Sequence, residues 1–161
     1  MSQAKAIPER SQIAPEFTWN TADLYPTDQA WQEDFSRLQA MVPKLAACAG
    51  RLGESADALY AYVTLEQEAG ELLVKLMDYA QRRSDEDTRV PEYQAMVGKI
   101  TSQYVALSQA VSFEIPEVLR IPTQTLERFY GEKPELELYR RYFTIIQDRR
   151  EHTLSDAEEK L

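Results

Sequence analysis

Apolar residues recur at intervals of three and four along most of this chain, which is the spacing of one helical face. The first such stripe follows Thr27, a residue type that caps helix N-termini, and we expect the helix to end at Gly50–Gly53. Pro43 predicts a kink or a break inside it. The apolar members of the stripe are Trp31, Phe35, Leu38, Val42 and Leu45.

Two longer stripes predict a pair of helices joined by a short turn. The second helix can be capped by Ser55 and reaches Arg83, with Gly70 as a candidate for a bend; the turn is expected over residues 84–89, and Pro91 takes the favoured first position of a third helix. Such a pair forms an antiparallel hairpin in which each helix covers the other's apolar stripe. The two stripes are Leu59, Tyr62, Leu65, Ala69, Leu72, Leu76 and Ala80, then Tyr93, Val97, Ile100, Tyr104, Leu107 and Val111.

The remaining signals predict shorter helices. Between residues 113 and 131, Pro116 and Pro122 separate short apolar groups, and Thr123 is expected to cap a turn or two. Pro134 opens a further helix, and Arg149 and Arg150 suit its negative C-terminal end. No run alternates with the period of a strand, so the sequence predicts an all-α, bundle-like fold: a long antiparallel hairpin with additional shorter helices. The inward residues expected here are Leu126, Phe129, Tyr130, Leu136, Tyr139, Phe143 and Ile146.

The two ends of the sequence differ from this helical body. Residues 1–17 contain Pro8 and Pro15 and are expected to form an extended arm, which Trp19 and the segment 24–26 would pin to a helical domain of residues 18–161. Ser155 and Glu158 have the spacing of a capping box, which predicts a new helix. Because a helix of about six residues cannot offset its nucleation cost, we expect the natural polypeptide to continue past Leu161.

Charge excludes several classes of partner. The 161 residues include 18 Lys and Arg against 27 Asp and Glu, a formal net charge of -9. This balance repels phosphate backbones and anionic lipid, so we expect neither nucleic acid nor a membrane as a partner. No apolar stretch of signal-peptide or membrane-span length is present, and the cytoplasm is the expected location.

Few residues have the pattern of a reactive centre. The one histidine, His152, is not followed by a Glu-x-x-His continuation and has no local partner for a triad. Cys48 is expected to be a buried structural thiol, and Asp85, Glu86 and Asp87 to form a solvated turn rather than a calcium loop. We therefore predict no catalytic residue and no metal ligand in this chain. Most of the nine tyrosines are expected to pack in the core, and which residues bind substrate stays unknown.

Several short motifs, taken in order, resemble the oligoendopeptidase F family of zinc metallopeptidases, within the thimet oligopeptidase-like clan. They are Thr18-Trp19-Asn20 with Asp23-Leu24-Tyr25-Pro26, then Tyr79-Ala80, Ser84-Asp85-Glu86-Asp87-Thr88, Pro91-Glu92-Tyr93-Gln94 and His152-Thr153-Leu154-Ser155. The similarity spans about residues 18 to 161. Val90 departs from the family, which often has an Asp at this position as a helix cap.

The resemblance implies an N-terminal, non-catalytic domain of a cytoplasmic enzyme that hydrolyses short peptides. The family's His-Glu-x-x-His motif and its further zinc-binding Glu lie beyond this sequence, so zinc is implied for the full-length enzyme and no catalytic residue carries over. The segment would form part of the wall of a substrate channel and limit substrate size. Its partners would be short peptides and the remainder of its own polypeptide, and the isolated domain could form a homodimer. The alternative is a standalone helical interaction module without catalysis.

Overall fold

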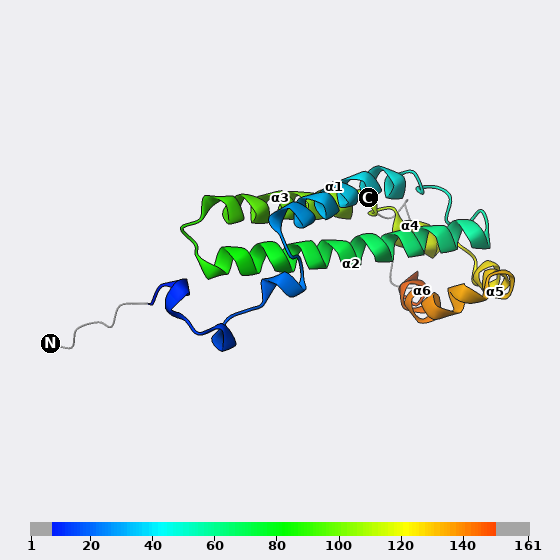
Figure 1. Cartoon of the computed structure of the whole chain (residues 1–161). Helices are drawn as coiled ribbons and strands as arrows, with labels where there is room; N and C mark the ends of the chain where they lie inside the picture. The colour runs from blue at the N-terminus through cyan, green and yellow to red at the C-terminus, as the bar shows by residue number, and fades with distance from the viewer. Residues whose placement is uncertain (1–7, 151–161) are drawn as a thin grey trace. The chain divides into compact units, whose positions relative to one another are not determined.

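The computed structural model describes residues 8–150, which form α-helices and short 3-10 helices and contain no β-strand. The long helices are α1 (Asp28–Ala46), α2 (Ala56–Glu86) and α3 (Pro91–Ala110), followed by α4 (Glu114–Arg120), α5 (Thr123–Glu132) and α6 (Arg140–Gln147) (Figure 1). The 3-10 helices η1 (Arg10–Gln12), η2 (Pro15–Phe17) and η3 (Thr21–Asp23) precede α1, and η4 (Pro134–Tyr139) precedes α6. The all-α prediction is confirmed. The predicted capping box at Ser155–Glu158 lies outside the described residues.

The long helices begin where the sequence predicts. The Ala30 amide donates to Thr27 Oγ1 at 3.1 Å, and the Ala58 amide donates to Ser55 Oγ at 3.1 Å. Each hydroxyl thus satisfies one of the amides that have no partner within the first turn of a helix. Pro91 is the first residue of α3, where its missing N–H costs no hydrogen bond.

The helix ends differ from the sequence prediction. α1 is not broken at Pro43, which lies inside the helix, and it ends at Ala46, before Gly50. α2 continues past Gly70 and past Arg83 to Glu86, so the turn is confined to residues 87–90. Arg83 pairs with Glu86 at 3.0 Å, and such contacts one turn apart stabilise the last turn of a helix.

The chain divides into two compact units. Among the described residues, unit 1 comprises 8–39 and 70–105, and unit 2 comprises 40–69 and 106–150. The predicted division into an arm of residues 1–17 and a domain of residues 18–161 stays a prediction.

Unit 1 is held together by aromatic residues packed between helices. Trp31 stacks on Phe35 with ring centroids 5.1 Å apart, and its indole N–H donates to the Leu76 carbonyl at 2.9 Å. Tyr25 meets Tyr79 edge to face at 5.4 Å. Within this unit α2 and α3 run side by side in opposite directions (Figure 1), as expected for the hairpin. The buried apolar residues are Tyr25, Trp31, Phe35, Leu38, Leu72, Leu73, Leu76, Tyr79, Ala80 and Ile100.

One predicted contact of unit 1 is wrong, and another is made at the surface. Tyr104 is 51% exposed, whereas its neighbour Gln103 is buried, because α3 turns the face containing Ile100 and Gln103 inward. Trp19 contacts the hairpin without being buried: it is 70% exposed, and the Arg82 guanidinium lies 5.2 Å from its ring centroid. Tyr25 is the aromatic residue of this segment that is buried.

Unit 2 packs short helices against the N-terminal part of α2. The backbone amides of Gly50 and Leu52 both donate to the Glu117 carboxylate, at 2.8 and 2.6 Å, which fastens the turn before α2 to α4. Gly50 has a φ of 82°, a conformation that favours glycine. The buried apolar residues are Met41, Leu45, Leu52, Ala56, Leu59, Tyr62, Val63, Ala69, Leu107, Val118, Ile121, Leu126, Phe129, Tyr130, Leu136, Phe143 and Ile146.

Three predicted details of unit 2 are corrected. Thr123 is the first residue of α5 and does not cap it; its hydroxyl donates to Gln147 Oε1 at 2.9 Å. The helix predicted from Pro134 is divided into η4 and α6, and within it Tyr139 is only partly buried. Arg150 donates to the carbonyls of Leu119 and Ile121, so it caps the C-terminal end of α4.

Candidate functional site

The residues singled out from the sequence do not come together as a reactive centre. Cys48 is half-buried rather than buried, its Sγ lies 3.4 Å from the Lys44 carbonyl, and burial raises the pKa of the thiol. Asp85 and Glu86 belong to α2, and only Asp87 lies in the turn. His152 lies outside the described residues. Within residues 8–150, no three His, Cys, Asp or Glu side chains are grouped so that they could hold a metal ion.

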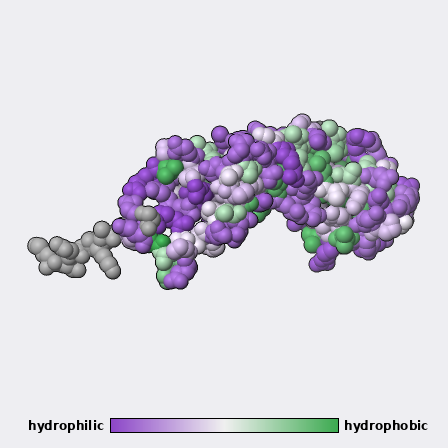
Figure 2. Space-filling view, in the orientation of Figure 1, coloured by the Kyte–Doolittle hydropathy of each residue, from purple (hydrophilic) through white to green (hydrophobic). Residues whose placement is uncertain are grey.

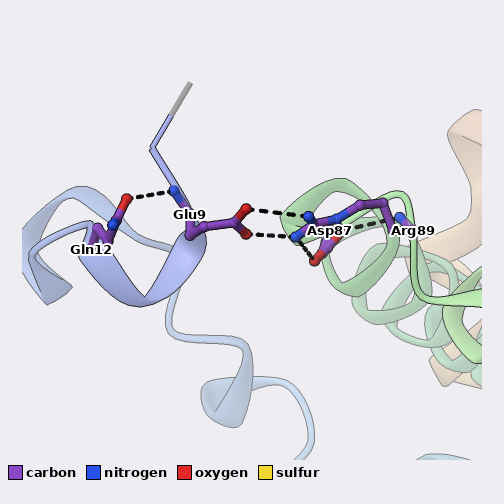
Figure 3. A network of polar contacts seen from close by, with 4 residues as sticks. All are labelled: Glu9, Gln12, Asp87 and Arg89. Atoms are coloured by element: carbon purple, nitrogen blue, oxygen red, sulfur yellow. Dashed lines mark hydrogen bonds and ion pairs between the residues drawn. The ribbon is translucent and has the colours of Figure 1, made fainter. Parts of the chain in front are cut away.

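The tip of the α2–α3 hairpin carries a network of charged side chains (Figure 3). Arg89 donates two hydrogen bonds to the Glu9 carboxylate, at 3.2 and 2.6 Å, and two more to Asp87, at 2.8 and 2.7 Å. The hydrogen bonds from Arg89 hold the pKa of Asp87 at about 2. Alongside, Arg10 pairs with Glu86 at 2.7 Å. We call Glu9, Arg10, Glu86, Asp87 and Arg89 the tip network.

The tip network attaches the N-terminal segment to the hairpin. Within residues 8–24, no apolar side chain is buried, and the tip network supplies ion pairs between this segment and the hairpin. Salt screens such exposed pairs, and each contributes little to stability by itself. The segment is therefore the part of unit 1 that can detach with least loss of buried apolar surface.

Unit 2 contains a second polar group, which is buried. Glu114, at the start of α4, is 7% exposed, and its Oε1 accepts a hydrogen bond from the Tyr142 hydroxyl of α6 at 2.8 Å. Tyr62 of α2 is fully buried, and its ring lies against Phe113 with centroids 5.5 Å apart. Glu66 follows Tyr62 by one helical turn and is half-buried. We call Tyr62, Glu66, Glu114 and Tyr142 the carboxyl–tyrosine cluster.

The electrostatics of this cluster disfavour negative charge. Burial raises the pKa of Glu114, and interactions with the hydroxyls of Tyr142 and Tyr62 oppose the rise. Burial also raises the pKa of Glu66, and the charge of Glu114 adds to the effect. The Tyr62 hydroxyl is near enough to Glu114 to interact with it, yet it has no hydrogen-bond partner of good geometry among the described residues.

Sequence reasoning missed this cluster because its members come from three separated helices. Tyr62 was expected as an ordinary core residue of the hairpin, and Glu114 lies in a segment with only short apolar groups. Glu66 and Glu114 have no local motif that marks them. Only the packing of α2, α4 and α6 brings these side chains together.

Comparison with known proteins relates the chain to peptidases. The family model described as Oligopeptidase F matches residues 117–161. The chain is 36% identical to Oligopeptidase PepF of Bacillus subtilis over 159 residues, covering 99% of this chain and 24% of that protein. It is 30% identical to Group B oligopeptidase PepB of Streptococcus agalactiae, covering 94% of this chain and 25% of that protein. This chain matches the N-terminal region of oligoendopeptidase F. It spans about a quarter of the length of these relatives.

Solved structures agree with this similarity to oligoendopeptidase F. The crystal structure of oligoendopeptidase-F from Enterococcus faecium matches with a TM-score of 0.69 at 28% identity, over 82% of this chain and 25% of that one. A crystal structure from Chlamydophila abortus shares the fold, with a TM-score of 0.82 at 24% identity over 96% of this chain and 26% of that one. The resemblance recognised from the sequence motifs is therefore confirmed. Among the described residues, no helix is both long and apolar enough to cross a membrane.

Proposed function

We propose that this chain works as the N-terminal, non-catalytic part of a longer zinc-dependent oligoendopeptidase that hydrolyses short peptides in the cytoplasm. The observation that carries this proposal is the match of nearly the whole chain to about a quarter of Oligopeptidase PepF. Since the described residues group no metal ligands, the zinc would be held by other parts of the longer polypeptide.

The role we propose for the chain is to form part of the wall of the substrate channel and to limit substrate size. A helical hairpin suits this role because its two long helices support each other along their length and need no reactive group. A rigid wall rejects folded proteins by its shape, and its movement can enclose a bound peptide before hydrolysis.

The test loosens the hairpin core in the longer enzyme. Leu76 is fully buried beside Trp31, and Leu76→Ala should cost about 2–5 kcal/mol of stability by leaving a cavity. Val74, on the same helix, is 60% exposed, so Val74→Ala is the matched control. Both variants would be assayed with a series of quenched peptides of increasing length.

The expected result is that Leu76→Ala changes the longest peptide that the enzyme cleaves, while Val74→Ala leaves the limit unchanged. An unchanged limit in a folded Leu76→Ala enzyme would exclude the hairpin as a determinant of substrate size. If the native polypeptide proved to be this chain alone and hydrolysed no peptide, the alternative of a helical interaction module, including a homodimer, would replace the proposal.

A further inference from the structure

One side of α6 presents large apolar side chains to solvent. Leu138, in η4, is 84% exposed, and Tyr142 and Ile145, in α6, are 44% and 41% exposed. Their spacing of four and three residues places them along one side of this helical stretch. Figure 2 shows apolar surface where Figure 1 draws α6. We call Leu138, Tyr142 and Ile145 the α6 stripe.

The α6 stripe is additional to the face that α6 buries within unit 2. Phe143 and Ile146 supply that buried face. Together with the stripe they cover roughly 160° of the helix circumference, at about 100° per residue. A helix at the surface of a domain typically needs an apolar width of about 100° to face its own core. Because the apolar width of α6 exceeds this need and its exposed part is a continuous stripe, we expect a second element to pack on α6.

The chain that follows α6 is the element nearest to this stripe. α6 ends at Gln147, and the capping box at Ser155 predicts that the next helix begins there. The connection therefore comprises residues 148–154. Connections of about 2–8 residues in helical bundles join helices that lie side by side in opposite directions. The Oligopeptidase F family model matches residues 117–161, so α6 and the chain after it belong to one matched region.

We propose that the α6 stripe is the docking surface for the helix that begins near Ser155 and continues into the longer polypeptide. The two helices would form an antiparallel hairpin, which would attach unit 2 to the remainder of the enzyme. That the polypeptide continues far enough to complete this helix rests on the proposed function, since the chain spans about a quarter of Oligopeptidase PepF. The exposure of the stripe rests only on the side chains of unit 2.

The short connection favours this helix over a second copy of the chain. A helix tethered by a short link is present beside α6 at an effective concentration on the order of 1 mM. A second copy reaches the stripe only at its free concentration, so below the millimolar range it loses the competition. The stripe is therefore exposed in the 161-residue chain, the short chain, and covered in the longer polypeptide.

A photo-crosslinking experiment on the longer polypeptide identifies what covers the stripe. The photoreactive amino acid p-benzoylphenylalanine would replace Ile145 in one variant and Thr144 in the control, because Thr144 is exposed on another side of α6. Illumination should link position 145 to the stretch that begins at Ser155 in the same polypeptide, with a yield several-fold above that from position 144. A link to another part of the polypeptide, to a second copy or to an added peptide would overturn the proposal.

Hydroxyl-radical footprinting provides a second measurement without any substitution. Oxidation of Leu138 and Tyr142, read by mass spectrometry, should be several-fold slower in the longer polypeptide than in the short chain. Phe143 is fully buried and should react little in both, which controls for the integrity of unit 2. Equal oxidation of the stripe in the two polypeptides would overturn the proposal.

Failure of the proposed function gives a different result. A longer polypeptide that hydrolyses no peptide, while position 145 still links to the helix after Ser155, would reject the peptidase assignment and leave the docking surface intact. A peptidase in which position 145 links elsewhere would reject the docking surface and leave the peptidase assignment intact.

Discussion

At the scale of single residues, the carboxyl–tyrosine cluster contrasts with the tip network, because Glu114 is buried beside tyrosines whereas the acids of the tip network pair with arginines. Glu114 and Glu66 both have raised pKa values through burial, whereas Asp87, in the tip network, has a pKa lowered by Arg89. The first arrangement disfavours the ionised form and makes stability depend on pH above the ordinary carboxyl range, and the second stabilises the ionised form.

The stability of the short chain should fall as pH rises above the ordinary carboxyl value of 4.5. Below it, Glu114 is protonated in both the folded and unfolded states. Between the ordinary and the raised pKa the unfolded chain ionises first, so stability decreases, and above the raised pKa the loss is complete. Urea unfolding at several pH values should show that the free energy of unfolding changes less with pH in Glu114→Gln than in the wild type. The Glu114→Gln variant keeps the other groups of the cluster, which are Tyr62, Glu66 and Tyr142, and the nearby Arg149. In the control variant Glu16→Gln, the free energy of unfolding should depend on pH as it does in the wild type.

The two tyrosines of the cluster should respond to different extents to loss of the hydroxyl. Tyr62→Phe removes a hydroxyl that interacts with Glu114 without a well-formed hydrogen bond among the described residues, so it should change the stability of the short chain by less than about 1 kcal/mol. Tyr142→Phe removes the donor to Glu114 and should destabilise it by about 1 kcal/mol. Chemical denaturation of both variants tests the pair, and a loss of stability for Tyr62→Phe as large as that for Tyr142→Phe would contradict the expected difference.

At the scale of elements, several helices and turns are completed by side chains from distant parts of the chain. Glu117 of α4 accepts the amides of Gly50 and Leu52, and Gln147 and Arg150 donate to carbonyls at the end of α4. A turn that follows one helix is thus fastened to another, which ties local structure to tertiary packing.

Removing this connection should destabilise unit 2. Glu117→Ala leaves two backbone amides without their acceptor and should cost about 2–3 kcal/mol, because hydrogen bonds to charged groups are among the stronger ones. Glu54, in the same turn, pairs with Arg51 at the surface, so Glu54→Ala should cost less than about 0.5 kcal/mol. Thermal unfolding of the two variants measures the two losses of stability. Similar losses would contradict the role of Glu117 as the acceptor that holds the turn.

The N-terminal segment should detach when the tip network is weakened. Arg89→Ala removes the pairs with Glu9 and Asp87, and high salt screens those that remain. Chymotrypsin cleavage near the exposed Phe17 and Trp19 should therefore accelerate several-fold. Arg128→Ala, which removes an exposed pair in α5, is the control and should leave the cleavage rate unchanged.

At the scale of the whole molecule, the chain is a helical scaffold whose proposed role depends on the rest of a longer enzyme. The 161-residue chain should bind no stoichiometric zinc and should cleave no quenched peptide. The reason is that the sequence contains one histidine, whereas the zinc site implied by the family needs two histidines and a carboxylate. Equilibrium dialysis with zinc and a peptide cleavage assay test this expectation. Cleavage by the purified short chain would place the chemistry within it.

The sequence by itself determined the helical class, the starts of the long helices and most of the core. Thr27, Ser55 and Pro91 mark those starts through interactions within one turn, and the stripe from Leu59 to Ala80 follows from the period of the helix alone. These features depend on residues close in sequence. The peptidase resemblance was also readable, because its motifs are short and occur in order.

Only the tertiary structure decided which polar groups meet. Three features depend on how separate helices pack. They are the burial of Gln103 instead of Tyr104, the hydrogen bond from the Gly50 amide to Glu117, and the contacts among Tyr62, Glu114 and Tyr142. Helical periodicity defines a face to within about one residue, and it cannot say which distant side chain will lie opposite. Interactions between residues close in sequence therefore determine the helices, and long-range packing determines the polar contacts between them.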